Sequence, residues 1–174
     1  MILPVSLFLA KPPLPVERQF AEAKARAMLE GKRLFFAVGN QMCISCRRFD
    51  TDVREPVVQA ALSRRHVFLG VNMDVEAARI LRRLEGESVA IPFWLILDPA
   101  TGKVIADAAV REGSDRFVPM PMRTQGLTLL LQGLKRSDPS ISTDDLWRIR
   151  LKLGPDTVLA EIAARLSSTV KRAP

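Results

Sequence analysis

Apolar residues along this chain fall into two kinds of pattern, helical repeats and short continuous runs. From Val16 to Glu30 they recur at every third or fourth position, which predicts a helix that Gly31 ends. The segments Leu34 to Val38 and Val67 to Val71 are instead unbroken apolar runs of strand length. The first half of the chain therefore predicts a helix and two buried strands.

Three more helices are predicted around these two strands. One begins at Cys43 and breaks near Pro56, and a second, short helix starts with this proline, which is tolerated in the first turn of a helix. Asp74 is a suitable N-cap for a third helix, from Val75 to Glu85. Strands and helices thus alternate, which is typical of α/β domains in which consecutive strands can run parallel.

Two further apolar runs form a predicted β-hairpin. Pro92 to Leu97 and Lys103 to Ala106 are separated by a polar turn over Asp98 to Gly102. Because the strands of a hairpin run antiparallel, this pair adds antiparallel strands to the parallel ones. The fold class that we predict is α/β, with a central mixed sheet flanked by helices.

The last third of the chain is predicted to be helical. Residues 123–136 carry an apolar stripe at helical spacing, formed by Leu127, Leu130, Leu131 and Leu134. Two more amphipathic segments follow, Thr143 to Leu153 and Asp156 to Ser168. We expect these two segments to pack on the domain as an appendage, with a dimer or partner interface as the alternative.

The chain divides into three predicted parts: residues 1–15 as a leader or linker, 16–136 as the main domain, and 137–174 as a helical C-terminal extension. The apolar run from Ile2 to Ala10 is too short to span a bilayer. It also lacks the basic start and the small-residue cleavage pattern of a standard signal peptide. A shortened signal, a misassigned start and an edge strand are all compatible with it.

The composition says more about possible binding partners than about the activity of the protein. The 174 residues carry 26 Lys and Arg against 19 Asp and Glu, a net charge of +7, and 48% of them are hydrophobic. The basic residues are scattered along the chain without aromatic residues between them, so we expect no nucleic-acid binding. A basic surface favours acidic protein partners or an anionic membrane surface.

Cys43 and Cys46 are the two cysteines of the sequence, and two residues separate them. They lie where a buried strand passes into a helix, so the first sulfur is placed at a helix N-terminus, where a thiolate is favoured over a thiol. The spacing also lets the two sulfurs form a disulfide. A zinc site, for which the chain offers His66 as its one histidine, and a structural disulfide or inert thiol pair are the alternatives.

These features together resemble the thioredoxin superfamily, from about Val16 to Ala109. The resemblance rests on the Cys-Ile-Ser-Cys motif after a buried strand, on the βαβ unit that follows, and on Ile91-Pro92 at the start of the hairpin. The segments Glu30 to Leu34 and Arg47 to Val53 are most similar to the exported branch of the superfamily. That branch includes small thioredoxin-like proteins and the C-terminal domains of membrane disulfide reductases.

The resemblance implies a thioredoxin fold with a helical extension, and roles for the residues of the motif. Cys43 would be the nucleophile and Cys46 the resolving thiol. Pro92 would be a cis-proline beside the sulfurs, with the backbone of Ile91 pairing with the substrate peptide. The neighbours of the cysteines are expected to contact the substrate as well: Met42, Ile44 and Ser45.

The chain also departs from the superfamily pattern. Met42 occupies a position where many members have tryptophan, and Ala37 a position that holds a buried acid in thioredoxin itself. Without that acid, proton transfer from Cys46 must use water or another carboxylate. The dipeptide Ile44-Ser45 matches neither thioredoxins nor glutaredoxins, so it does not predict the direction of electron flow.

The segment from Val110 to Met122 is a second candidate for substrate contact. The return strand of the predicted hairpin must end at the edge of the sheet where Pro92 begins its partner. The loop that leaves this strand carries Phe117 and Met120, side chains suited to a tolerant apolar contact with extended protein chains. Covering the sheet edge is an equally good explanation for these side chains.

We therefore predict a thiol–disulfide oxidoreductase that acts on protein thiols or disulfides, or on a redox partner protein. The alternatives are a non-catalytic thioredoxin-like interaction module with a vestigial motif, and a small thiol-dependent peroxidase. We expect no cofactor, no stable metal and no membrane association, and a periplasmic or exported location. Trp94 is expected in the core, and His66 at the surface or the edge of the sheet.

Overall fold

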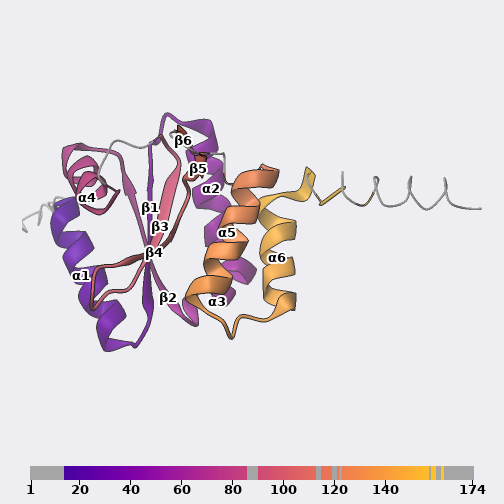
Figure 1. Ribbon diagram of the computed structural model, residues 1–174, viewed down its shortest axis with the longest axis horizontal. Coiled ribbons are helices and arrows are strands. Elements are labelled where there is room, and N and C mark those ends of the chain that lie inside the picture. The colour runs from indigo at the N-terminus through magenta and orange to yellow at the C-terminus, as the bar shows by residue number, and fades with distance from the viewer. Residues whose placement is uncertain are drawn as a thin grey trace, which may run out of the picture.

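Helices cover both faces of a four-stranded sheet in the computed structural model of the chain (Figure 1). The structure describes residues 14–85, 90–112, 115–118, 121, 123–156, 158–159 and 162. Its elements are, in chain order, α1 (Val16–Leu29), β1 (Arg33–Gly39), α2 (Ile44–Arg54), α3 (Pro56–Ser63), β2 (His66–Asn72), α4 (Val75–Glu85), β3 (Phe93–Leu97), β4 (Val104–Asp107), β5 (Val110–Glu112), β6 (Asp115–Phe117), α5 (Thr124–Ser137) and α6 (Thr143–Leu153).

The sheet is mixed, with the strand order β2-β1-β3-β4. Strands β1 and β2 run parallel, and β3 runs antiparallel to both β1 and β4. The predicted parallel pair and the predicted hairpin are both confirmed. It follows that β1, β2 and β4 end at the same edge of the sheet, and that β3 begins there.

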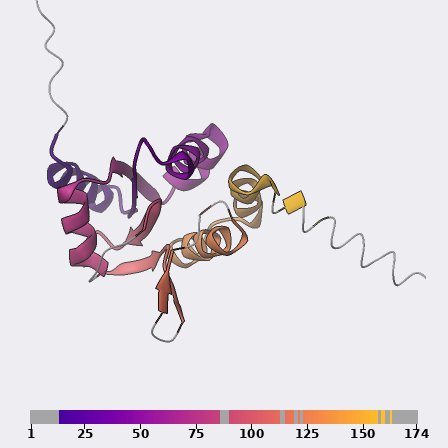
Figure 2. The same cartoon turned by 90° about the horizontal axis from the view of Figure 1, so that it is seen from above.

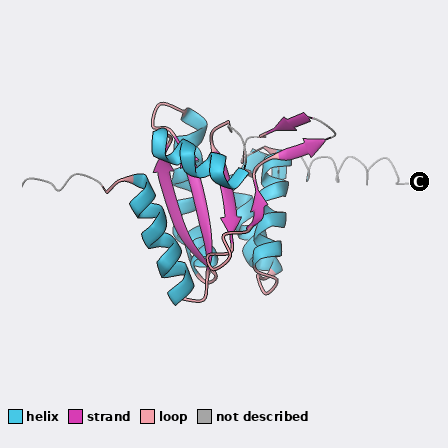
Figure 3. Cartoon of the chain, turned by 60° about the vertical axis from the view of Figure 1, so that its left-hand side comes forward, coloured by secondary structure: helices cyan, strands magenta, loops and turns pink. Residues whose placement is uncertain are grey.

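The helices form two layers, one on each face of the sheet (Figures 1 and 2). Helices α1 and α4 contact each other on one face, and α2, α3, α5 and α6 cover the other. Figure 3 shows the same layering, with strands enclosed between helices. This arrangement confirms the predicted fold class, a mixed sheet flanked by helices with additional C-terminal helices.

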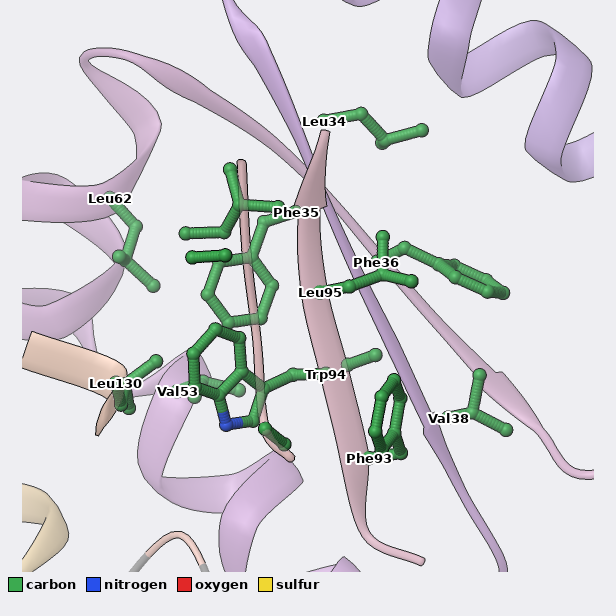
Figure 4. Close-up of a cluster of buried hydrophobic side chains, with 14 of the residues drawn as sticks. Leu34, Phe35, Phe36, Val38, Val53, Leu62, Phe93, Trp94, Leu95 and Leu130 are labelled. Atoms are coloured by element: carbon green, nitrogen blue, oxygen red, sulfur yellow. The ribbon is translucent and has the colours of Figure 1, made fainter. Parts of the chain in front are cut away.

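Both faces of the central strands are buried, which explains their unbroken apolar runs. On one face the ring of Phe35 stacks against Trp94, with ring centroids 5.8 Å apart (Figure 4). On the other face Phe36 meets Phe20 of α1 edge to face at 5.1 Å. All five residues of β3 are buried, Trp94 among them as predicted. Burial on both sides removes the alternation of polar and apolar residues that a half-exposed strand would show.

Local signals set the ends of several helices. Gly31 takes a left-handed conformation, with φ of 62°, directly after α1, and the N–H of Lys32 then donates to the carbonyl of Ala27. Pro56 is in the first turn of α3. The side chain of Ser142 accepts a hydrogen bond from the backbone N–H of Asp145 at the start of α6.

Helix α6 packs on the domain, against α2, α3 and α5. Its residues Ile149 and Leu153 are fully buried, and Lys152 forms an ion pair with Glu55 at 3.4 Å. An ion pair between Arg64 and Asp145 also joins α6 to the main domain. The predicted helix over Asp156 to Ser168 lies mostly outside the described residues.

Two sequence-based expectations need correction. Residues 110–117 form a short two-stranded hairpin, β5 and β6, where we expected a loop. Each strand has three residues, most of them charged, so no apolar pattern marks them. His66 does lie on β2, at the edge of the described sheet, but its side chain is buried, with 3% of its surface exposed.

No helix in the described part of the chain is long and apolar enough to cross a membrane.

Candidate active site

The Cys-Ile-Ser-Cys motif lies between the end of β1 and the start of α2. Asn40 shapes the connecting loop, because its side-chain oxygen accepts from the N–H of Met42 at 2.8 Å and its carbonyl accepts from the N–H of Cys43 at 3.0 Å. Cys43 is the N-cap of α2, and its Sγ accepts from the N–H of Cys46 at 3.2 Å. The first sulfur therefore occupies the position that a serine or aspartate oxygen takes in most N-caps.

Cys43 and Cys46 form a disulfide, with their Cα atoms 5.2 Å apart. The Ser45 hydroxyl lies 3.3 Å from Cys43 Sγ and donates to it, since a disulfide sulfur has no proton to give. The two sulfurs differ in exposure: Cys46 is buried at 5%, whereas Cys43 is half-buried. An external thiol or disulfide can therefore reach Cys43 more easily.

Two exposed apolar side chains flank Cys43 in the sequence. Met42 is 89% exposed and Ile44 is 76% exposed. Apolar side chains left in water beside a reactive sulfur suit contact with a protein surface. The side chains directly before and after Cys43 are thus apolar, and Arg47 and Arg48 follow in the first turns of α2.

Pro92 lies beside the motif, as the predicted pairing of strands requires. Val38 of β1 pairs with Phe93 of β3, so Pro92 stands next to the end of β1. The peptide bond between Ile91 and Pro92 is cis. Pro92 is buried and lines the same cleft as Cys46, and Ile91 is half-buried.

This cleft, of about 250 Å³, opens between α2 and the ends of β1 and β2. Small residues create it. Ala37 pairs with Gly70 across the two strands, and Gly39 lies on the same face two positions further along β1. Earlier on the same face, Phe35 and Phe68 fill the space with their rings. The hollow under the first turns of α2 is therefore the result of three positions with little or no side chain.

Gly39 allows α2 to approach the sheet closely. A Cβ atom at Gly39 would lie 3.0 Å from Cys46 Cβ, a separation that packed side chains rarely show. A Cβ atom at Gly70 would lie 3.5 Å from Asp50 Oδ1 and 3.1 Å from the Phe68 ring. Cys46 thus rests on the bare backbone of Gly39, whereas the tight neighbour of Gly70 is the Phe68 ring and Asp50 lies at an ordinary contact distance.

Comparison with known proteins identifies the domain that carries this site. A family model described as thioredoxin-like matches residues 16–99. Among solved structures, the chain is similar to a disulphide isomerase from Xylella fastidiosa Temecula1, with a TM-score of 0.51 and 14% sequence identity over 82% of this chain and 94% of that one. Residues 16–99 therefore form a thioredoxin-like domain.

Two further solved structures resemble the thioredoxin-like domain less closely. A thioredoxin from Thermus thermophilus has a TM-score of 0.46 and 22% identity over 67% of this chain and 81% of that one. A protein described as DsbH oxidoreductase has a TM-score of 0.42 and 13% identity over the same shares. No curated protein matches the sequence.

The thioredoxin-like domain brings most of the predicted site residues together. Met42, Cys43, Ile44, Ser45 and Cys46 lie at the start of α2. Pro92, with Ile91 before it, is next to them across the cleft.

Phe117 and Met120 are the remaining predicted site residues. Met120 lies outside the described residues, and so does the side chain of Phe117, whose backbone ends β6. Strand β4 does end at the same edge of the sheet as β1, but Figure 2 shows the β5–β6 hairpin extending away from α2. Substrate contact by Phe117 and Met120 stays a prediction.

A metal site is one of the alternatives for the two cysteines. Within the residues that the structure describes, no group of three or more His, Cys, Asp or Glu side chains is arranged to hold a metal ion.

The cleft and its polar lining are the part of the site that the sequence analysis missed. Its lining includes Asp50 and Arg54 from α2 together with Gly70 from β2. The signal was present, because a glycine inside a strand often marks a close approach of another group. Gly70 interrupts the apolar run Val67 to Val71 at the position where Asp50 comes close.

Proposed function

We propose that this protein is a thiol–disulfide oxidoreductase in which Cys43 and Cys46 exchange disulfides with protein thiols or with a redox partner protein. The observation that carries the proposal is the asymmetric sulfur pair at the start of α2, with Cys43 half-buried and Cys46 buried. The thioredoxin-like match over residues 16–99 supports it. The position of Pro92 on the cleft that Cys46 also lines supports it further.

The proposed reaction has two exchange steps. In the reduced enzyme the Cys43 thiolate, favoured by the N-terminal end of α2, attacks one sulfur of a substrate disulfide. A bond forms between Cys43 and that sulfur, and the other substrate sulfur leaves as a thiolate and takes a proton. Cys46, deprotonated, then attacks Cys43 Sγ and releases the second substrate thiolate. Two electrons pass to the substrate, and the enzyme is left with the Cys43–Cys46 disulfide; the reverse sequence oxidises a dithiol.

The residues around Cys43 are proposed to bind the substrate. Met42 and Ile44 offer exposed apolar contact, and the Ser45 hydroxyl, which donates to Cys43 Sγ, can stabilise negative charge on that sulfur. Pro92 would act as the family's cis-proline, with the half-buried Ile91 pairing through its backbone with an extended peptide. A periplasmic or exported location is proposed with this function, because the segments beside the motif are similar to exported relatives.

Trapping with the two cysteine variants tests the assignment. A Cys46→Ser variant with Cys43 reduced cannot resolve the mixed disulfide, so it should accumulate a Cys43-linked adduct when it attacks the disulfides of a protein such as insulin. A Cys43→Ser variant should trap nothing. The adduct is measured as a mass shift that dithiothreitol reverses. Equal trapping by both variants, or by neither, would leave the interaction module with a vestigial motif as the better explanation.

A further inference from the structure

Strand β2 forms an open edge of the described sheet. It is the outermost strand on its side, and its register with β1 is regular over seven residues. Its centre, from Phe68 to Val71, is only half-buried, whereas all five residues of β3 are buried. Proteins usually protect such an edge with proline, charged side chains, a bulge or a covering segment. The sequence of β2 contains neither proline nor Lys, Arg, Asp or Glu, so this edge is suited to pairing with a further strand.

Alternate peptide groups of β2 point out of the sheet. The N–H of Met73, directly after β2, donates to the carbonyl of Gly39 at 2.6 Å, so the odd-numbered residues of β2 bond to β1. The even-numbered residues alternate with them and present their N–H and C=O groups to the outside. In the described part of the chain, no hydrogen bond joins the outward peptide groups of Phe68 or Gly70 to another segment.

A groove follows this edge from the cysteine cleft to the start of β2. The cleft that Cys46 lines also includes Phe68, Gly70 and Arg54. A second hollow, of about 300 Å³, is lined by Phe68 and Arg54 again and reaches His66. Its walls come from α1 on one side and from α2 and α3 on the other. Because the two hollows share two residues and both follow β2, we call them together the β2 groove.

The charged side chains along the β2 groove are mostly basic. Four cations and two carboxylates line it: Arg26, Lys32, Arg47, Arg54, Glu30 and Asp50. Both carboxylates already have partners, since Glu30 pairs with Lys32 at 2.7 Å and Asp50 pairs with Arg54 at 2.9 Å. Four cations against two carboxylates leave an excess of two positive charges. The groove therefore favours an acidic ligand.

Charge also separates the segments that could occupy this edge. A second copy of the chain, paired through its own β2, would bring two basic grooves together, and like charges repel. Residues 2–10 of this chain contain no acidic side chain, and Pro4 among them has no N–H for pairing. An extended acidic segment of another protein complements both the peptide groups of the edge and the charge of the walls.

We propose that the β2 groove binds an extended, acidic segment of a partner protein as an additional strand. The backbone of that segment pairs with the outward peptide groups of Phe68 and Gly70, and its carboxylates meet the basic side chains of the walls. Pairing of this kind takes affinity from the main chain and selectivity from the side chains along the groove. That the partner is a protein whose thiols or disulfide react at Cys43 rests on the proposed function, because the groove begins at the cleft that Cys46 lines.

Amide hydrogen exchange, followed by NMR in the full oxidised chain, tests the groove residue by residue. The probe is a synthetic peptide of about nine residues that alternates valine and glutamate, long enough to span β2. In the protein alone, the amides of Leu69 and Val71, which bond to β1, should exchange slowly, and those of Phe68 and Gly70 rapidly. With the peptide bound, exchange at Phe68 and Gly70 should slow about tenfold or more.

Slow exchange at Phe68 and Gly70 in the protein alone would overturn the proposal, because the edge would already be covered. Loss of that protection on dilution would then identify a second copy as the occupant, and its persistence would identify residues 2–10. The proposal also fails if the valine–glutamate peptide gives no protection, or if a peptide of alternating valine and lysine gives as much.

Arg26→Glu and Arg18→Glu are matched variants for the charge of the groove. Both arginines lie on α1, pair with a glutamate one helical turn further along and are more than half exposed, but of the two only Arg26 lines the groove. Arg26→Glu should weaken binding of the valine–glutamate peptide about threefold or more, and Arg18→Glu should leave it unchanged. Equal affinities in the two variants would contradict the proposed charge selection. Trapping at Cys43 does not depend on these results, so a failure of the groove is distinct from a failure of the proposed function.

Discussion

At the scale of single residues, His66 shows how burial makes stability depend on pH. Its Nδ1 lies 3.2 Å from the carbonyl of Leu62, and its Nε2 lies 2.8 Å from the hydroxyl of Ser137 at the end of α5. Burial lowers the pKa of His66 below its ordinary value of 6.5, against a hydrogen bond to Leu62 and the charge of Asp138, which raise it, while Arg33 lowers it further. The folded protein therefore binds this proton less tightly than the unfolded chain does.

The free energy of unfolding should fall as the pH is lowered from about 8 to about 5.5. The unfolded chain takes up the proton first, near pH 6.5, so the stabilisation is present above that value and is lost as the pH falls through the lower pKa of the folded state. His66 is the one histidine of the sequence, so His66→Gln should flatten this slope. Urea unfolding of the oxidised protein at several pH values in this range measures the slope, and an unchanged slope in the variant would contradict the prediction.

The sequence predicts some residues of this molecule far better than others. The cysteine pair and Pro92 are recognisable because each has a chemical signature at a fixed place in the order of elements. The burial of His66 is not recognisable from the sequence, because this residue follows two arginines in a polar stretch and its partner Ser137 is 71 residues away. Asp50 is hidden for a similar reason, since only the cleft that it lines together with Cys46 distinguishes it from other acidic residues on a helix surface.

At the scale of elements, the contact between α5 and the sheet depends on a glycine in the middle of a helix. A Cβ atom at Gly133 would lie 3.0 Å from both Ala106 Cβ and the Trp94 ring. Trp94 is 1% exposed and is stacked on Phe35, so its ring has no room to move. Glycine at this position lets α5 pack directly on β3 and β4.

Gly133→Ala should therefore destabilise the protein, although alanine favours helix formation by about 1 kcal/mol. Overpacking a rigid core costs about 1–3 kcal/mol, so we expect a net loss of up to about 2 kcal/mol in the free energy of unfolding. Adding Ala106→Gly should recover part of that loss, because it removes one of the two close contacts. A rise in stability on Gly133→Ala would show that α5 can shift away from Trp94.

The elements of the sheet could be predicted because their apolar patterns are strong. Both parallel strands, the β3–β4 hairpin and helices α1 to α6 follow from apolar runs, helical spacing and end signals such as Gly31 and Pro56. The β5–β6 hairpin could not be predicted, since its two strands are short and most of their residues are charged, so no apolar pattern marks them. The cleft could not be predicted either, because it depends on the register of two strands relative to α2.

At the scale of the whole molecule, α6 completes the helix layer that contains α2, the helix that begins at the cysteine motif. Ile149 and Leu153 are fully buried, while Trp147 on the same helix is 45% exposed. Ile149→Ala should lower the free energy of unfolding by about 2–5 kcal/mol, because it leaves a cavity in this contact. Trp147→Ala, the matched exposed position, should change it far less. Urea unfolding distinguishes the two variants, and equally small losses of unfolding free energy in both would mean that α6 contributes little to the stability of the domain.

One atom, Cys43 Sγ, both caps the start of α2 and carries the proposed reactivity of the protein. Serine is itself a good helix cap, so Cys43→Ser removes the sulfur chemistry and retains an acceptor for the Cys46 N–H. Alanine at the same position would remove both, so loss of activity in that variant could not be separated from fraying of the helix. Any evolutionary loss of this cysteine that passes through serine would therefore give a protein without the proposed exchange chemistry whose α2 still begins at the same residue.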